Sequence, residues 1–433
     1  MAKFQIKNGK NLYFRFGRAS NLCIKKNSRD LFLFRGLTVI AQMLSGIILA
    51  RLLGPESRGV FALLVLVPTL CGQIGSFGFN FTNAFFIEHP NFYLKNIAGY
   101  TLYLQLIIVV VIAGIFYILS PLLAKMMGVY NNLFELKFLI LAIPLMLIMQ
   151  NGAGSLLGQK RFRAIGLIQF MRPFAFLTGM LFLNLFGLIS ISYFIAVFMF
   201  SFLLPAILLF FISPNSFNIA QPSKGNIYKI IRFSFPIWIA HVSGFLFYRI
   251  DLFILSLWWD HETCGIYAVS FFIAEGMGLF GSTLGEVIFP YIIATFGNKN
   301  SQFLSKALRY SLSITTVLAL LVGMSAPYLV NMFFGESFLP AVPIILLTLP
   351  GIVARNGLKV LSSWHIANAN VKLNAFVNGF GALLVLILNL LFIPSWGMVG
   401  AATVTSFVFI LLFFLSLAAA KSSKSPSLLT NLS

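Results

Sequence analysis

Long uninterrupted apolar runs are the feature that most constrains this chain. A helix that crosses a bilayer needs about 20 apolar residues, and lipid offers no partner to an unpaired backbone group. Strands of a membrane barrel would be short and alternating, which these runs are not. The pattern predicts an all-α integral membrane protein with about twelve transmembrane helices. We place the spans at 31–53, 59–87, 95–119, 134–157, 164–186, 188–212, 229–257, 263–296, 303–330, 338–361, 371–393 and 396–420.

Composition agrees with this fold class. The 433 residues are 59% hydrophobic and 9% charged, whereas a soluble domain is about a quarter charged. The net charge of +20 would suggest a nucleic-acid partner in a soluble protein. Here we attribute it to orientation in the membrane and to contact with acidic lipid headgroups, so no nucleic-acid partner is expected. The basic N-terminal segment, 1–30, has no apolar core with a cleavage site and is not expected to be a cleaved signal peptide.

Lysine and arginine are concentrated on one side of the predicted topology. One set of loops holds Lys95, Lys160, Arg161, Arg163, Lys224, Lys229, Arg232, Lys299, Lys306, Arg309, Lys372, Lys421 and Lys424. The opposite set holds only Arg51, Arg58, Lys125 and Lys137, together with Glu56, Glu135, Asp260, Glu262 and Glu336. Basic loops stay in the cytoplasm, so both termini are expected there and the number of spans is expected to be even.

The chain divides into two halves. A hydrophilic connector with Pro214, Pro222 and Gly225 lies at its middle, which is typical of a linker. The predicted units are the basic N-terminus 1–30, a six-helix bundle 31–212, a cytoplasmic linker 213–228, a second six-helix bundle 229–420 and a tail 421–433.

The two halves form a repeat. A shift of 206 residues places 59–62 (Gly-Val-Phe-Ala) on 265–268 (Gly-Ile-Tyr-Ala), Gly75-Ser76 on Gly281-Ser282, and 141–144 on 347–350. An even number of spans per half makes this a parallel repeat about an axis along the membrane normal. Transporters built in this way place the substrate path between the halves, which predicts a central cavity.

Polar stripes on the helices agree with the repeat. The first two spans carry the candidate cavity residues Thr38, Gln42, Ser45, Gln73, Ser76, Asn80 and Asn83, and Tyr248 continues the set in span seven. Spacings of three, four and seven residues put them on single helical faces, which we expect to turn away from lipid. Small polar residues also serve as packing contacts between membrane helices, which is the alternative interpretation.

Charged side chains inside the spans predict the nature of the cargo. The candidate cationic set is Arg35, Arg172, Arg249, Arg355, Lys359 and His241, and the acids are Asp251, Glu275 and Glu286. Arginine binds phosphate through two parallel hydrogen bonds, so an excess of cations suits an anionic cargo. The basic side chains near span ends can instead extend to the headgroups. His241 can equally be a packing residue, and the glutamates can form structural ion pairs.

No catalytic or metal-binding pattern occurs. The chain lacks a Walker A motif and a paired carboxylate site, its histidines are dispersed, and Cys23, Cys71 and Cys264 have neither metal-ligand nor disulfide-framework spacing. We therefore expect a transporter that is not an enzyme and has no cofactor or metal.

The loop 50–62 (Ala-Arg-Leu-Leu-Gly-Pro-Glu-Ser-Arg-Gly-Val-Phe-Ala), with Gly75, Gly78 and Asn83 after it, resembles the start of polysaccharide-biosynthesis flippases of the Wzx type. These export O-antigen and capsule repeat units and belong to the multidrug/oligosaccharidyl-lipid/polysaccharide (MOP) flippase superfamily. Gly54 ends one helix, and Pro55 with Glu56 begins the next.

The resemblance implies two bundles in a V around a cavity that opens to alternate sides. The implied cargo is an undecaprenyl-pyrophosphate-linked oligosaccharide, moved from the cytoplasmic to the periplasmic leaflet of a bacterial inner membrane. Coupling to H⁺ or Na⁺ is expected for the superfamily, with Asp251, Glu275 or Glu286 as the coupling acid. Glycan-assembly proteins such as a polymerase are the expected partners, besides membrane lipids.

Three alternatives stay open at this point. A multidrug or cation exporter of the same superfamily would prefer an acidic or aromatic pocket. A membrane scaffold would not need matching polar stripes, and a glycosyltransferase would need a larger hydrophilic loop with paired carboxylates. Arg51 and Arg58 have no counterparts in the second half and are candidates for a periplasmic gate; the alternative is a helix cap with headgroup contacts.

Overall fold

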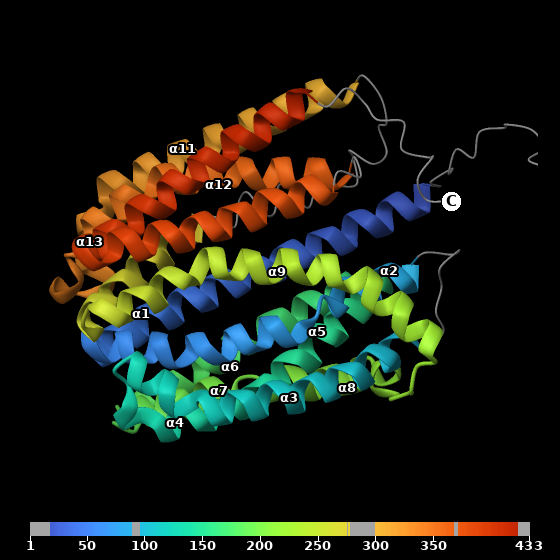
Figure 1. Cartoon of the computed structure of the whole chain (residues 1–433), viewed down its shortest axis with the longest axis horizontal. Coiled ribbons are helices and arrows are strands. Elements are labelled where there is room, and N and C mark those ends of the chain that lie inside the picture. The colour runs from blue at the N-terminus through green and yellow to red at the C-terminus, as the bar shows by residue number, and fades with distance from the viewer. Residues whose placement is uncertain (1–17, 89–95, 275, 278–298, 368–370, 423–433) are drawn as a thin grey trace, which may run out of the picture.

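Figure 1 shows the computed structural model, which describes residues 18–88, 96–274, 276–277, 299–367 and 371–422. Every regular element in these ranges is a helix, which confirms the all-α fold class. The α-helices are α1 (Arg18–Ser76), α2 (Phe79–Glu88), α3 (Ile97–Met126), α4 (Leu133–Phe138), α5 (Ala142–Gly158), α6 (Phe162–Leu185), α7 (Ile191–Phe200), α8 (Leu203–Ile212), α9 (Lys224–Trp258), α11 (Lys299–Phe334), α12 (Ala341–Ala367) and α13 (Val371–Ser422). Residues 261–274 are also helical, and short 3-10 turns occupy Tyr130–Asn132, Leu139–Leu141, Pro214–Phe217 and Glu336–Phe338.

Two very long helices are each folded back at a glycine. Gly54 in α1 has φ 70° and Gly397 in α13 has φ 56°, a region that L-residues with side chains rarely adopt. The apolar segments around them run for 55 residues (Leu33–Ile87) and 48 residues (Leu373–Ala420). At about 1.5 Å per residue, each is more than twice as long as the roughly 30 Å hydrocarbon core, so each supplies two crossings. The predicted helix break at Gly54 is confirmed.

Nine segments of the described chain are long and apolar enough to cross a membrane. Two of these are the folded-back pairs, and most of the predicted span 263–296 lies outside the described residues. The count of twelve crossings therefore stays a prediction.

Several predicted spans are divided in the structure. The span 59–87 breaks between α1 and α2, where Phe77 (φ 45°) and Gly78 (φ 70°) both leave the helical region. The span 188–212 divides into α7 and α8, since Pro205 has no N–H to continue the helix from the turn before it. Apolar periodicity does not detect such breaks, because the hydrophobic pattern continues across them.

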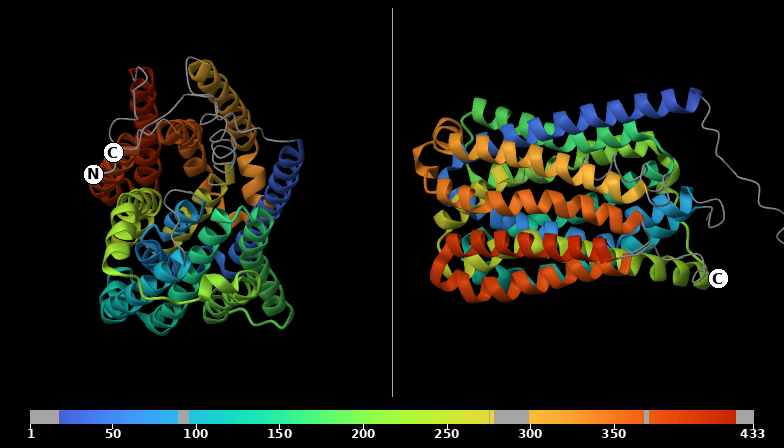
Figure 2. Two further views of the ribbon diagram at one scale, coloured as in Figure 1. Left: turned by 90° about the vertical axis from the view of Figure 1, so that its right-hand side faces the viewer. Right: turned by 90° about the horizontal axis from the view of Figure 1, so that it is seen from above.

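The helices form two packed groups that lie side by side along their length (Figure 1). In the first, α1 packs on α6, and α5 packs on α2 and α3; in the second, α13 packs on α12 and α9, and α12 packs on α11. Figure 2 shows the second group on one side of the bundle and most of the first group on the other. The predicted linker contains the turn Pro214–Phe217 and the start of α9, and the predicted domain boundaries stay a prediction.

The two groups share a core at one end of the bundle. We call this the distal end: α1 and α13 fold back there, and it lies opposite the start of α1 and the end of α13 (left in Figure 1). Its apolar cluster combines Leu63 and Phe194 with Leu255 and Tyr267 from the other group. The clusters around Leu156 and Leu209 and around Val360 and Phe409 each belong to one group, whereas the cluster of Phe79, Phe86 and Ile97 includes Ile230 of α9. The distal cluster is the largest that the two groups share, so the halves are joined most extensively there.

Candidate functional site

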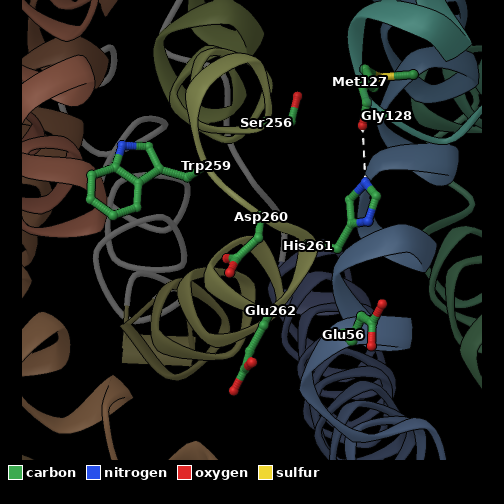
Figure 3. Close-up of a pocket in the computed structure, with 8 residues that line it drawn as sticks. All are labelled: Glu56, Met127, Gly128, Ser256, Trp259, Asp260, His261 and Glu262. Atoms are coloured by element: carbon green, nitrogen blue, oxygen red, sulfur yellow. Dashed lines mark hydrogen bonds between the residues drawn. The ribbon is translucent and has the colours of Figure 1, made fainter.

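A pocket of about 350 Å³ opens at the distal end between residues of both halves (Figure 3). Its lining residues are Glu56, Met127, Gly128, Ser256, Trp259, Asp260, His261 and Glu262. The His261 ring points to the first half, where its Nε2 lies 3.1 Å from the backbone oxygen of Met127 (Figure 3). The Trp259 indole donates a hydrogen bond to the carbonyl oxygen of Ile393 at 2.9 Å. This bond holds the Trp259 side of the pocket against α13.

Asp260 caps the helix that begins beside this pocket. Its Oδ1 accepts a hydrogen bond of 2.9 Å from the backbone N–H of Thr263, so it satisfies one donor of the first turn. Hydrogen bonding from the Thr263 side chain and backbone lowers the pKa of Asp260 below its usual value.

Arg51 and Arg58, the candidate gate residues, lie in different environments. Arg51 is exposed and donates from Nε to the carbonyl oxygen of Phe333 at 2.8 Å, and its other arm donates to the carbonyl oxygen of Met332. It therefore joins the first half to the C-terminal end of α11 in the second, where carbonyls lack partners within the helix. Arg58 is half-buried, with its guanidinium 5.8 Å from the Phe61 ring centre.

Arg172 is held by aromatic rings inside the first half. Its guanidinium lies 5.0 Å from the ring centre of Phe198 and 4.2 Å from that of Phe202. Phe198 in turn packs edge-on against Phe61, at 6.0 Å between centroids. Arg58 and Arg172 thus contact one aromatic cluster, and Arg58 is also near enough to Arg249 of the second half for their charges to interact.

The other candidate cations are spread along the second half and α1. Arg249 is half-buried over Phe271, with 5.4 Å between guanidinium and ring centre. Arg355 is 4% exposed and packs near Phe409, while Arg35 and Lys359 are half-buried. His241 is half-buried, and its ring meets Phe81 of α2 edge-on at 5.0 Å. These residues do not form a single cluster.

Of the three candidate coupling acids, the structure describes Asp251, which is buried. It is 1% exposed, accepts a hydrogen bond from the hydroxyl of Tyr267, and accepts a second from the backbone N–H of Leu252. Glu275 and Glu286 lie outside the described residues, as does the side chain of Tyr248. The coupling role of all three acids stays a prediction.

The three hydroxyl residues of the predicted polar stripes, Thr38, Ser45 and Ser76, donate to carbonyl oxygens of their own helices. Thr38 and Ser45 donate to the carbonyl oxygens of Phe34 and Ala41, each at 2.7 Å. Ser76 donates to the carbonyl oxygen of Gln73 at 2.8 Å. Gln42 is exposed, and Gln73 and Asn80 are half-buried. In this conformation the stripe residues do not line one shared pocket, and their cavity role stays a prediction.

Asn83 lies in a buried polar network that the sequence analysis missed. It donates to the Oδ1 of Asn151 at 3.1 Å, its own Oδ1 accepts from Thr101 at 2.8 Å, and Asn151 donates to Gln105 at 3.0 Å. Each of the four is at most 2% exposed, so Asn83 joins α2, α3 and α5 and does not face an open cavity here. Thr101 and Gln105 are four residues apart in an otherwise apolar run, a spacing that could have indicated the network.

Within the described ranges, no three His, Cys, Asp or Glu side chains lie close enough to hold a metal ion.

Comparison with known proteins assigns the chain to a family. Residues 48–343 match the family described as polysaccharide biosynthesis protein, which is well over half of the chain. The chain belongs to this family. The match begins just before the Gly54 break and ends near the start of α12, so it covers the contact of Arg51 with Phe333 and that of His261 with Met127 but not the Gly397 break.

Solved structures of a flippase and of two transporters have the same fold. A lipid II flippase, MurJ, in an inward closed conformation is 15% identical, covers 90% of this chain and 87% of its own, and gives a TM-score of 0.77. An inward-facing multidrug resistance MATE family transporter of the MOP superfamily is 13% identical, with 89% and 94% covered and a TM-score of 0.72. A MOP superfamily transporter from Pyrococcus furiosus, described as having a binding pocket of reverse polarity, gives 0.63 at 11% identity, with 92% and 94% covered.

One curated relative has no assigned activity. An uncharacterised membrane protein of Methanocaldococcus jannaschii is 28% identical over 145 residues, which are 32% of this chain and 28% of that protein. The chain is therefore a multi-pass membrane protein of the polysaccharide biosynthesis protein family, with a fold that flippase and transporter structures share.

Proposed function

We propose that this protein is a flippase for a lipid-linked oligosaccharide, with an undecaprenyl-pyrophosphate-linked glycan as its cargo. It moves the cargo from the cytoplasmic to the periplasmic leaflet of a bacterial inner membrane, with both termini in the cytoplasm and the distal end toward the periplasm. Membership in the polysaccharide biosynthesis protein family supports the glycan part of the proposal.

The observation that carries the proposal is the balance of charge inside the bundle. Arg58, Arg172 and Arg249 are half-buried and Arg355 is buried, whereas Asp251 is the buried acid of the described part. Removing a charge from water costs several kcal/mol in order of magnitude, so such residues are kept for a function or for a specific contact. Arginines suit a pyrophosphate because their planar fork matches its oxygen atoms.

Both halves contribute these cations. Arg58 and Arg172 belong to the first half, and Arg249, Arg355 and Lys359 belong to the second. A cargo headgroup that contacts both sets would favour one arrangement of the halves, and its release would favour another. That difference in affinity is what alternating access requires of a substrate.

Coupling to an H⁺ or Na⁺ gradient is part of the proposal, with Asp251 as the coupling residue. Its burial and its Tyr267 partner support the assignment, since a carboxylate in that position changes its contacts when it loses or gains a proton or cation. Glycan-assembly proteins such as a polymerase are the proposed partners.

A deletion strain of the host tests the proposal. Lipid-linked sugars are measured in each leaflet, with the wild-type protein and an Arg58→Ala, Arg249→Ala variant supplied in trans. The expected result is accumulation in the cytoplasmic leaflet, relieved by the wild-type protein and not by the variant at equal abundance. Normal surface glycan together with new sensitivity to cationic drugs would instead establish a multidrug exporter, the function suggested by the similarity to the MATE family fold.

A further inference from the structure

The internal repeat brings two equivalent helix starts into contact at the distal end. One is the first turn after the Gly54 break, residues 55–59, and the other is the start of the helix 261–274. A shift of 206 residues places Pro55 on His261, Glu56 on Glu262 and Gly59 on Gly265.

The contact between these turns is reciprocal. A Cβ atom added to Gly59 would collide with the carbonyl oxygen of His261 and lie 2.9 Å from the backbone nitrogen of Gly265. A Cβ atom added to Gly265 would collide with the carbonyl oxygen of Pro55 and lie 2.9 Å from the backbone nitrogen of Gly59. Each glycine thus meets the equivalent residue of the other half, as expected on a two-fold axis between the repeats.

Backbone conformation does not explain why these two residues are glycines. Neither has a positive φ, so an alanine could adopt the same backbone geometry. Other glycines of the helices, such as Gly36 and Gly114, have nothing within 4 Å of an added Cβ. The close approach of two membrane helices is what requires glycine at 59 and 265.

The contact marks the boundary between the distal pocket and the shared core. One turn earlier, Glu56 and His261 line the pocket. Two residues after each glycine, Phe61 is 5% exposed and Tyr267 is 2% exposed, both within the cluster that joins the halves. A path between the halves that opens at the distal end has to separate the turn 55–59 from the start of the helix 261–274.

We propose that Gly59 and Gly265 form the distal gate of this protein, a glycine pair on the symmetry axis that closes only when both positions lack a side chain. The inference rests on the alternating-access part of the proposed function. It predicts that a methyl group at either position excludes the closed state but leaves the open state intact, because the collision exists only when the halves touch.

Distances between spin labels in the purified full-length chain test the gate without any cargo. The labels are placed at Lys125→Cys and Leu339→Cys, which are exposed at the distal end on opposite halves, in a parent in which Cys23, Cys71 and Cys264 are replaced by alanine. In the parent, double electron–electron resonance should report mainly one short distance. Gly59→Ala and Gly265→Ala should each lower the ratio of short to long distances by about tenfold or more, since backbone overlap is costly to relieve.

Gly114→Ala is the matched control and should leave the distances unchanged. The double variant Gly59→Ala, Gly265→Ala should behave like either single variant, because one methyl group already separates the turns. Parent-like distances in both single variants, or additive shifts in the double variant, would overturn the proposal. Failure of either single variant to give monodisperse protein would also overturn it, since the open state has to accommodate the methyl group.

This outcome is independent of the cargo. If the distances change as expected but the deletion strain shows no lipid-linked glycan, the gate stands and the glycan proposal fails. If glycan accumulates but the distances stay at parent values, the glycan proposal stands and the gate fails.

Discussion

The Nε of Arg51 lies 2.8 Å from the backbone oxygen of Phe333 and donates to it across the boundary between the two halves. The acceptor belongs to the last turn of α11, where the carbonyl groups have no partner further along the helix. A cation at this position also complements the negative end of the helix dipole. Arg51 thus binds the second half through backbone carbonyl groups of α11, which are present whatever side chains residues 332 and 333 carry.

Loss of this contact should weaken closure of the distal end. Arg51→Ala is expected to reduce the ratio of short to long distances between the labels at 125 and 339, by about fivefold for the loss of about 1 kcal/mol of hydrogen bonding. Arg51→Lys should give an intermediate value, because an ammonium group keeps the charge but lacks the planar fork. The same measurement on Lys137→Ala, a cation at the same end, should match the parent. Parent-like values for Arg51→Lys would mean that the fork does not matter, and parent-like values for Arg51→Ala would contradict the prediction.

Arg172 should stabilise the first half through its aromatic contacts. A double-mutant cycle with Arg172→Met and Phe202→Leu is expected to give a coupling energy of about 0.5–2 kcal/mol, which is the range of cation–π interactions. The measurement is thermal unfolding of the purified protein in detergent. Coupling near zero, combined with loss of glycan export in Arg172→Met at normal abundance, would place Arg172 in contact with cargo instead.

The polar network around Asn83 should contribute to stability in a coupled manner. Asn83→Ala and Thr101→Val are expected to be non-additive by about 0.6 kcal/mol, as for other hydrogen bonds between membrane helices. Thermal unfolding of the two single variants and the double variant measures the difference. Thr178→Val serves as the control, because the Thr178 hydroxyl is exposed and donates to the carbonyl oxygens of its own helix. Strict additivity would mean that the network does not act as a unit.

Asp251 should connect export to the ion gradient. In proteoliposomes with the host's lipid-linked glycan, Asp251→Asn is expected to abolish the stimulation of export by an imposed H⁺ or Na⁺ gradient. Tyr267→Phe should keep the stimulation but shift its dependence on ion concentration, because the carboxylate remains and loses one donor. Asp260→Asn is the control at an exposed acid. Full stimulation in Asp251→Asn would exclude this residue and leave Glu275 and Glu286.

The Asp260 cap should stabilise the start of the helix 261–274 in a pH-dependent way. Asp260→Ala is expected to lower the free energy of unfolding by about 1 kcal/mol at neutral pH. The folded-state pKa of Asp260 is lowered below its unfolded value of about 3.9, so the contribution is complete above that pH and is lost as the pH falls through the folded-state pKa. The unfolding temperatures of wild type and variant should therefore converge in acid. A difference between the two unfolding temperatures that persists undiminished into acid would contradict this prediction.

Much of the fold could be predicted from local sequence. Gly54 followed by Pro55 and Glu56 predicts a helix end and a helix start, and the structure places both there. The break at Phe77 could not be predicted, because phenylalanine has no preference for a positive φ and the apolar pattern continues through it. The neighbouring Gly78 lies close to α9, where a Cβ added to it would be 3.0 Å from the carbonyl oxygen of Ser234, a residue remote in sequence.

The site was less predictable than the fold. The 206-residue shift shows that Gly59 and Gly265 are equivalent, but equivalence does not reveal which pairs lie on the axis and touch. The partner of Arg51 was equally hidden, since a backbone carbonyl of α11 has no sequence signature. The polar stripe predicts a cavity role for Asn83, but a stripe defines a face of the helix and not the residues that face it, which are Asn151 and Thr101.

The apolar cluster shared by the halves has an electrical consequence for the cell. Buried residues from both groups, such as Leu63, Phe194 and Leu255, fill the space between them. Transferring an ion from water into such a medium costs several kcal/mol even after relaxation, so the cluster is an insulator. In this conformation ions therefore do not leak through the protein, so the membrane potential is maintained. The gradient that is proposed to drive transport is preserved between transport cycles.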